Sequence, residues 1–94
     1  MKIIYTSNDN FDELIKEGLV IVDMFANWCG PCKMLGPVID ELSNKYDNIK
    51  FIKVDVDEFE ELAKRYGVMS IPTLIKFKDG KETDKKIGYL NIDD

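Results

Sequence analysis

The only two cysteines of this chain, Cys29 and Cys32, lie in the segment WCGPC and are separated by a glycine and a proline. Two thiols at this spacing are within bonding reach of each other, which suits thiol–disulfide exchange. A thiol at the N-terminus of a helix ionises more readily, because unpaired backbone amides and the positive end of the helix dipole stabilise the thiolate. Apolar residues at helical spacing follow the motif, so we expect a helix to begin at the cysteines and Cys29 to be the nucleophile.

An ordinary cysteine, with a pKa of about 8.5, is only a few per cent ionised at neutral pH. Lowering that pKa to about 7 makes roughly half of the thiol nucleophilic and requires about 2 kcal/mol, of which the helix dipole supplies about 0.3–1 kcal/mol. Hydrogen bonds to the Cys29 sulfur from the amide and thiol of Cys32 must supply much of the remainder. Pro31 presets a helical φ in the first turn, and Gly30 lets the backbone of a partner come close.

Three other interpretations of the cysteine pair are weaker. A structural zinc site needs four nitrogen or sulfur ligands, and two cysteines without any histidine would suffice only in a site shared between chains. The loop between Cys29 and Cys32 is so short that a structural disulfide would contribute only about 2 kcal/mol. An interpretation as two inert core cysteines would not explain the flanking Trp28 and the intervening Gly-Pro. Redox chemistry, which calls for no metal or organic cofactor, is the interpretation we adopt.

The composition narrows the class of protein. With 13 basic and 18 acidic side chains the net charge is −5, so nucleic acid and anionic membranes would repel the chain. The early apolar run Ile3–Tyr5 is too short for a signal peptide or a membrane span. A small secreted protein would carry more cysteines, spread along the sequence. We therefore expect a single domain over residues 1–94, located in the cytoplasm.

The hydrophobic period alternates between strand-like and helix-like along the chain. Strand-like runs cover residues 2–6, 19–25, 49–56, 73–77 and 81–88, and helix-like runs cover residues 10–18, 31–46 and 58–66. Asp79-Gly80 between the last two strands suits a tight hairpin turn. The order β-α-β-α-β-α-β-β predicts an α/β fold, in which strands separated by helices are parallel and the final hairpin makes the central sheet mixed.

The segment WCGPCK, with IVDMFA before it and SIPT after it, resembles the thioredoxin family, and the similarity runs through the whole chain in the same order. The resemblance implies a thioredoxin-like fold with helices on both faces of the sheet and a protein-disulfide reductase activity. It also implies that Cys29 is the exposed nucleophile that attacks a protein disulfide and that Cys32 is the more buried, resolving thiol. Thioredoxin reductase would then reduce the oxidised pair.

Two functions from other classes stay open beside this one. A protein with the same motif could oxidise or isomerise disulfides, although the Gly-Pro between the cysteines resembles the reducing members of the family. A non-catalytic scaffold could bind partners through an apolar surface around Trp28.

Asp23 interrupts the apolar run 19–25 and matches the family's buried aspartate, which relays a proton to or from Cys32. Lys53 matches the lysine that lies near this aspartate and tunes it. Burial should raise the pKa of Asp23, and Lys53 would oppose that shift. An aspartate at the end of a strand that reaches water remains the alternative.

The resemblance also implies a substrate-binding surface around the reactive sulfur. Its residues are Trp28, Gly30, Pro31, Ile71, Pro72, Ile87 and Gly88. Ile71-Pro72-Thr73 resembles the family's cis-proline loop, where the residue before the proline pairs with a bound peptide in strand fashion. Without the resemblance, an ordinary trans turn is the commoner outcome, and Trp28 could equally be a core residue.

The chain departs from the family pattern at several positions. Phe25 stands where many members carry a second tryptophan, and Met69-Ser70 replaces the commoner Arg-Gly. The family continues past GYLNIDD into a long amphipathic helix, which is missing or only begun in these 94 residues. The sheet face beside the helix 31–46 would then lie partly open, so we expect either lowered stability or a homodimer that covers that face.

Overall fold

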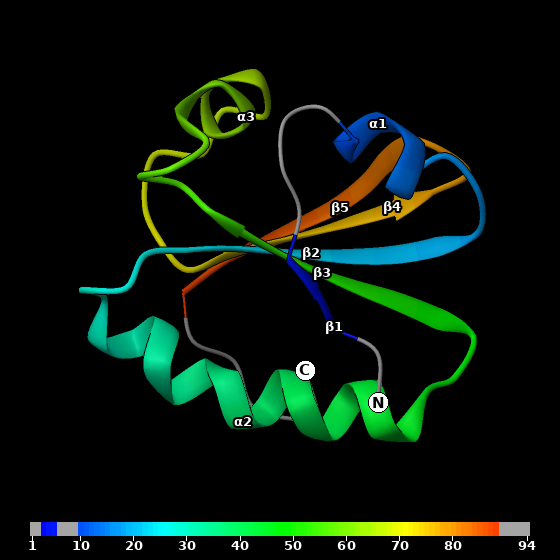
Figure 1. The fold of residues 1–94 in the computed structure, drawn as a ribbon, viewed down its shortest axis with the longest axis horizontal. Helices are drawn as coiled ribbons and strands as arrows, with labels where there is room; N and C mark the ends of the chain where they lie inside the picture. Colours follow the sequence, from blue (N-terminus) through cyan, green and yellow to red (C-terminus); the bar gives the residue numbers. More distant parts are fainter. Residues whose placement is uncertain (1–2, 6–9, 89–94) are drawn as a thin grey trace.

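The computed structural model describes residues 3–5 and 10–88. Its strands are β1 (Ile3–Tyr5), β2 (Leu19–Phe25), β3 (Ile49–Asp55), β4 (Thr73–Lys78) and β5 (Lys81–Ile87). Its helices are α1 (Phe11–Leu14), α2 (Gly30–Lys45) and α3 (Glu60–Arg65). These elements follow one another in the predicted order (Figure 1), which confirms the expected α/β class. The expectation that a C-terminal helix is missing or only begun concerns residues outside the described ones.

The strands form one mixed sheet in the order β1-β3-β2-β4-β5. β1 and β2 both pair with β3 in parallel, whereas β2–β4 and β4–β5 are antiparallel. β2 therefore lies in the middle of the sheet, and a strand with neighbours on both sides and helices on both faces needs a nearly continuous apolar sequence. This explains the run Leu19–Phe25, and it also places Asp23 in the centre of the molecule.

The helices lie on opposite faces of the sheet, α1 and α3 on one face and α2 on the other (Figure 1). The side chains of β2 alternate between these faces, as strand geometry requires. Val20, Val22 and Met24 are fully buried in the cluster with α1 and α3. Ile21 packs against the cluster formed with α2, and Asp23, two residues further on, shares its face.

The α2 helix begins where the sequence predicts it. Cys29 is its N-cap residue, Pro31 lies in its first turn, and the helix continues through Pro37 to Lys45. Leu35 and Ile39 are buried against the sheet. Among the described residues no helix is long and apolar enough to cross a membrane.

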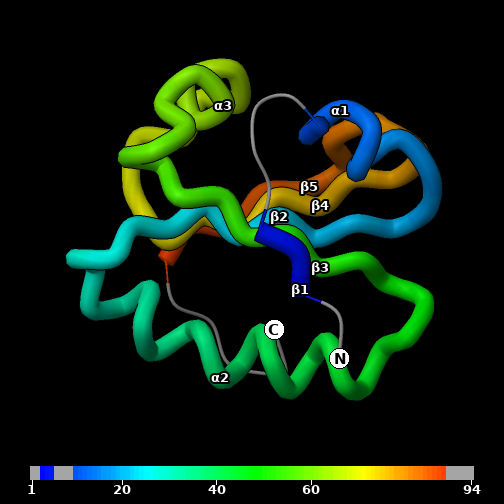
Figure 2. The backbone as a smooth tube through the Cα atoms, viewed as in Figure 1, coloured from blue at the N-terminus to red at the C-terminus, as the bar shows by residue number. Residues whose placement is uncertain are grey.

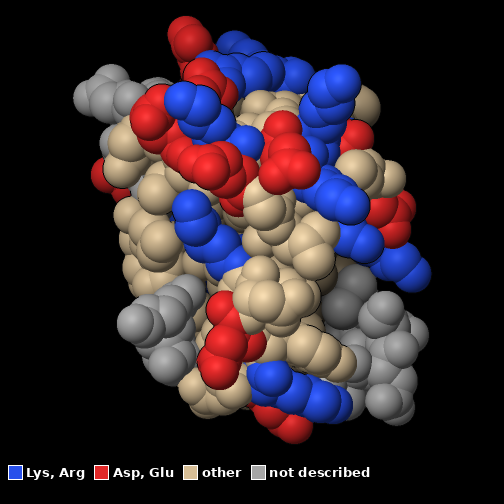
Figure 3. All heavy atoms as spheres, turned by 90° about the vertical axis from the view of Figure 1, so that its right-hand side faces the viewer, with Lys and Arg blue, Asp and Glu red and all other residues tan. Residues whose placement is uncertain are grey.

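The loops bring separate parts of the chain to one end of the molecule. In Figure 2 the segment after β2, the segment before β4 and the end of β5 meet on the side where α2 begins. At the opposite end (Figure 3), acidic and basic side chains are interspersed and neither sign dominates. The helix expected over residues 10–18 is shorter than predicted and covers only Phe11–Leu14. Gly18, with a φ of 76°, turns the chain into β2 and donates its N–H to Asp79 Oδ1 at 2.7 Å.

Candidate active site

Cys29 and Cys32 form a disulfide, with their Cα atoms 5.2 Å apart. The Cys29 sulfur accepts a hydrogen bond from the backbone N–H of Cys32 at 3.1 Å. This amide is one of those that an α-helix leaves without an internal partner at its N-terminus. The Cys29 sulfur therefore occupies the position of a capping oxygen, in the field of a 16-residue helix, as the sequence predicts.

The expected difference in exposure between the two cysteines is not found in the disulfide form. Both residues are 4% exposed, because the bond holds the two sulfurs together within one cluster. The two positions differ in their hydrogen bonding instead, since the Cys29 sulfur receives the Cys32 amide. The cluster around the disulfide contains Ala26, Phe25, Val56 and Ile71.

The loop before β4 lies directly against the disulfide. The Ile71–Pro72 peptide bond is cis, as expected, and the Ile71 carbonyl oxygen lies 3.8 Å from the Cys29 sulfur. This is a contact and not a hydrogen bond, because the sulfur carries no proton in the disulfide. Pro72 O accepts the N–H of Gly88 at 2.8 Å, which fixes the end of β5 beside the same loop, and Ile87 is exposed next to it.

Trp28 lies on the surface and not in the core, since 70% of it is exposed. Its indole N–H donates to Asp57 Oδ2 at 2.7 Å. Trp28 and Ile71 line a shallow pocket of about 290 Å³ that extends towards α3 past Met69, which is 97% exposed. Asp57 could not be assigned a role from the sequence, because that role depends on a contact between two loops.

Gly30 and Pro31 are exposed in the first turn of α2. A Cβ atom on Gly30 would meet no other atom within 4 Å, so packing inside the chain does not require a glycine there. The open space beside the sulfurs is available to another molecule. The structure thus gathers the predicted surface residues around the disulfide.

Asp23 is buried, with 2% of it exposed. It is the register partner of Lys53 on the neighbouring strand β3, and Lys53 Nζ lies 4.0 Å from Asp23 Oδ2. Neither carboxylate oxygen accepts a hydrogen bond from the described residues. Burial raises the pKa of Asp23 from 3.8 to about 6, against the opposing effect of the Lys53 charge. The alternative of an aspartate that reaches water is therefore wrong.

The sequence model of the thioredoxin family matches residues 2–94. The chain belongs to the thioredoxin family. The thioredoxin of Staphylococcus haemolyticus is 50% identical to it over 90 residues, which cover 95% of this chain and 86% of that one. The thioredoxin of Bacillus subtilis is 46% identical, with the same coverage of each chain.

Solved thioredoxins share the fold. A mutant thioredoxin from Halobacterium salinarum superposes with a TM-score of 0.91 at 35% identity, over 98% of this chain and 82% of that chain. The thioredoxin of Plasmodium falciparum gives 0.89 at 43% identity, over 97% and 89% of the two chains. The expected thioredoxin-like fold is confirmed. With the Cys29–Cys32 disulfide, family membership makes this chain a thioredoxin-type thiol–disulfide oxidoreductase, with disulfide-containing proteins and a reductase as its general partners.

Within this thioredoxin fold, two aromatic residues near Lys53 were not assigned a role from the sequence. Lys53 Nζ lies 4.9 Å from the ring centre of Phe25 and 5.8 Å from that of Tyr5. The two rings meet edge to face, with centres 6.4 Å apart. Phe25 also packs against the disulfide cluster, so it connects Lys53 to the cysteines. The signal that could have found Tyr5 is its register opposite Lys53, which a hydrophobic pattern does not provide.

Proposed function

We propose that this chain reduces disulfides of other proteins in the cytoplasm, with Cys29 as the attacking thiolate and Cys32 as the resolving thiol. The observation that supports this assignment best is the hydrogen bond from the Cys32 amide to the Cys29 sulfur at the N-terminus of α2. The same amide and the helix dipole would stabilise negative charge on that sulfur in the reduced protein.

The reaction proceeds in two exchanges. The Cys29 thiolate attacks one sulfur of the substrate disulfide, a bond forms between the two, and the other substrate sulfur leaves as a thiolate that takes up a proton. The Cys32 thiol then loses its proton and attacks the Cys29 sulfur, which forms the Cys29–Cys32 disulfide and releases the first substrate sulfur, which also becomes a thiol. The substrate gains two electrons and two protons, and thioredoxin reductase returns the oxidised chain to the dithiol.

Asp23 accepts the proton of Cys32 in the second exchange. A carboxyl group with a pKa of about 6 is largely ionised at neutral pH and can take up a proton without a large penalty. Lys53 tunes this group, because its positive charge favours the carboxylate. Asp23 and Lys53 thus act on the resolving step and not on the first attack.

The substrate binds across the exposed surface beside the disulfide. Its chain runs along the loop before β4, where the backbone of Ile71 pairs with it in strand fashion. Trp28 and Ile87 offer exposed apolar surface, and Gly88 is fixed to Pro72. Gly30 and Pro31 leave room for the substrate backbone above the sulfurs.

Substitution of the two cysteines tests the assignment of roles. Cys29→Ser should abolish the reduction of insulin disulfides, whereas Cys32→Ser should still attack and remain trapped as a mixed disulfide through Cys29, seen by mass spectrometry. Trapping through Cys32 in the Cys29→Ser protein, without any through Cys29 in the converse, would reverse the assignment.

A redox titration against glutathione tests the direction of the reaction. Thioredoxins have potentials near −270 mV, whereas a potential of about −180 mV or higher is typical of disulfide isomerases and oxidases. A scaffold function would be recognised differently, by full biological activity of the Cys29→Ser protein.

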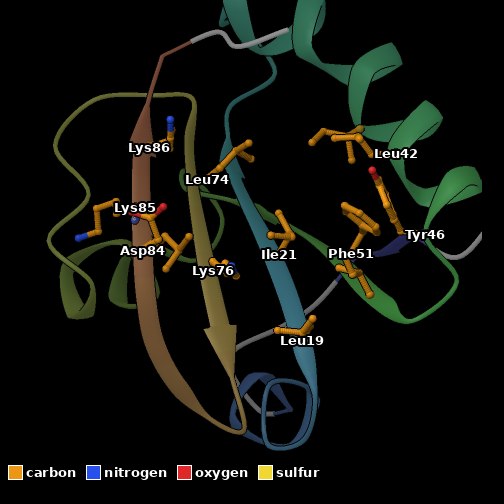
Figure 4. A pocket seen from close by; sticks show the side chains of 13 residues that line it. Leu19, Ile21, Leu42, Tyr46, Phe51, Leu74, Lys76, Asp84, Lys85 and Lys86 are labelled. Atoms are coloured by element: carbon orange, nitrogen blue, oxygen red, sulfur yellow. Dashed lines mark hydrogen bonds between the residues drawn. The ribbon is translucent and has the colours of Figure 1, made fainter. Parts of the chain in front are cut away.

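We also propose that a second copy of the chain covers a groove on the α2 face of the sheet. The groove has a volume of about 410 Å³ between α2 and the strands, and Figure 4 shows apolar side chains of β2, β3 and β4 facing Leu42 and Tyr46 of α2. Apolar grooves of this kind are rarely left to water in a monomer. Lys76, Asp84, Lys85 and Lys86 also line the groove, so side chains of both charge signs border its apolar part. Sedimentation of the 94-residue chain tests this: a dimer that Leu42→Asp dissociates supports it, and a monomer at all concentrations contradicts it.

A further inference from the structure

One row of residues crosses three strands on the α2 face of the sheet. Tyr5 of β1 pairs in register with Lys53 of β3, and Lys53 pairs with Asp23 of β2. Residues in register on neighbouring strands share a face, so the tyrosine, the lysine and the aspartate stand side by side. The buried carboxyl group is therefore linked through one lysine to a residue at the edge of the sheet.

The environment of Lys53 is unusual for a lysine. Only 15% of its side chain is exposed, and its ammonium lies beside two aromatic rings, 4.9 Å from the centre of Phe25 and 5.8 Å from that of Tyr5. A cation at this distance is attracted by the negative face of an aromatic ring. Tyr5 itself is 70% exposed and stands on the edge strand β1, so its ring lies on the solvent side of this group.

The position of this ammonium determines how strongly it acts on Asp23. Lys53 Nζ and Asp23 Oδ2 are 4.0 Å apart, which is longer than a hydrogen bond, so the interaction is one of charge. A charge interaction of this kind weakens when the lysine moves away or when water screens it. A ring that holds the ammonium and excludes water preserves it.

We infer that Tyr5 is a positioning residue of the redox site: its ring holds the Lys53 ammonium beside Asp23 and thereby controls proton transfer from Cys32. The inference rests on the proposed role of Asp23 in the second exchange. Tyr5 is not among the residues packed against the disulfide, and it acts through Lys53.

Among the register partners of Asp23 on the neighbouring strands, Lys53 is the charged one, and its effect on the pKa of Asp23 can therefore be measured. β4 places Leu74 opposite Asp23, and the row ends at Lys86 on β5. The buried residues in the first turns of α2 are Cys32 and Leu35. In the oxidised chain the cysteines do not titrate, so the pKa of Asp23 can be followed without interference from the thiols.

The test is the pKa of Asp23 in the oxidised chain, measured from its side-chain carboxyl carbon by NMR. The wild-type midpoint should lie at about 6. Tyr5→Leu keeps an apolar side chain but removes the ring, and it should raise the midpoint by about half a pH unit, the size of an exposed cation–π interaction. Tyr5→Phe keeps the ring and should leave the midpoint unchanged.

Tyr46→Leu is the matched control, because Lys45 Nζ lies 5.6 Å from the centre of the Tyr46 ring at the far end of α2. This substitution removes a similar lysine–aromatic pair and, at a concentration where the chain is monomeric, should leave the Asp23 midpoint unchanged. An unchanged or lowered midpoint in Tyr5→Leu would overturn the inference, as would an equal rise in Tyr5→Phe or in Tyr46→Leu.

Kinetic measurements test whether the pKa of Asp23 controls the second exchange. The pH profile of the rate at which substrate is released from the mixed disulfide should shift to higher pH in Tyr5→Leu, by the same amount as the Asp23 midpoint. If the midpoint moves and the profile does not, the assignment of Tyr5 to the reaction is wrong. Failure of the proposed function gives a different result, since Asp23→Asn would then leave the rate of release unchanged whatever Tyr5 does to the midpoint.

Discussion

The two faces of the sheet differ in composition and in how completely their apolar side chains are buried. On the face covered by α1 and α3, the described residues form a cluster with fully apolar, buried members. These are Phe11, Ile15, Val20, Val22, Met24, Ile52, Val54, Leu62, Ile75 and Phe77. On the face covered by α2, the buried cluster is smaller, part of its apolar lining borders an open groove, and Asp23 is buried without a hydrogen bond from the described residues.

The difference shows how one strand can serve stability and chemistry at once. Alternate residues of β2 point to opposite faces, so the apolar residues Val20 and Val22 stabilise the fold without entering the site. The next position, Asp23, introduces an unfavourable buried carboxyl group on the other face. A closed core on one side allows a destabilising group on the other.

A leucine truncation on the closed face should have the largest effect. Leu62 of α3 is fully buried, and Leu62→Ala should lower the free energy of unfolding by about 3 kcal/mol, since it leaves a cavity that the rigid cluster cannot fill. Urea denaturation measures this, and the folded variant should keep its disulfide-reductase activity. A loss below about 1 kcal/mol would mean that this face is not the main source of stability.

Removal of the buried carboxyl group should have an effect of opposite sign. Because the pKa of Asp23 is raised from 3.8 to about 6, the folded chain binds more protons than the unfolded chain between these values, and its stability falls as the pH rises through them. At neutral pH the loss is on the order of 3 kcal/mol. Asp23→Asn cannot ionise and should be more stable than the wild type by up to this amount.

The pH dependence is the control for this prediction. The advantage of Asp23→Asn in urea denaturation should be present above the folded pKa of about 6 and should disappear as the pH falls to 3.8. Equal stability of the two proteins at neutral pH would show that the carboxylate is solvated.

The matched leucine on the open face should matter less. Leu42 of α2 is only partly buried and borders the groove. Leu42→Ala should therefore lower the free energy of unfolding by about 1 kcal/mol, because part of its side chain already contacts water and no closed cavity forms. The comparison needs dilute protein, so that association does not contribute. A loss equal to that of Leu62→Ala would remove the contrast between the faces.

The smallest effect is expected at the edge of the substrate surface. Asp57→Ala removes the acceptor for the Trp28 indole N–H without changing the fold of the sheet. We expect kcat/KM for a protein disulfide to fall by about threefold, which corresponds to the free energy of one modest hydrogen bond. For a small disulfide such as oxidised glutathione, kcat/KM should not change. An equal fall for both substrates would place the effect on the sulfurs instead.

The sequence predicted the fold where local patterns are strong. The apolar run Leu19–Phe25, the Asp79-Gly80 turn and the helix start at Cys29 are all found at the expected residues. The first helix was predicted too long, because the turn at Gly18 is fixed by a hydrogen bond from Gly18 N–H to Asp79, a residue 61 positions away.

The site was predicted less completely, since its finer contacts depend on register and tertiary packing. The burial of Asp23 follows from the central place of β2, which the order of elements makes plausible but does not fix. The contacts of Lys53 with Tyr5 and Phe25 depend on which residues of three strands stand opposite one another. The expected difference in exposure between the two cysteines is not seen in the disulfide form, because the bond places both sulfurs in the same cluster.

The most direct test of the central claim is the reactivity of the two thiols in the reduced chain. Limited alkylation with iodoacetamide at neutral pH, followed by mass spectrometry of peptides, measures the rate at each cysteine. Cys29 at the N-cap of α2 should react at least about tenfold faster than Cys32, because the helix terminus stabilises its thiolate. Equal rates, or a faster reaction at Cys32, would contradict the assignment of Cys29 as the nucleophile.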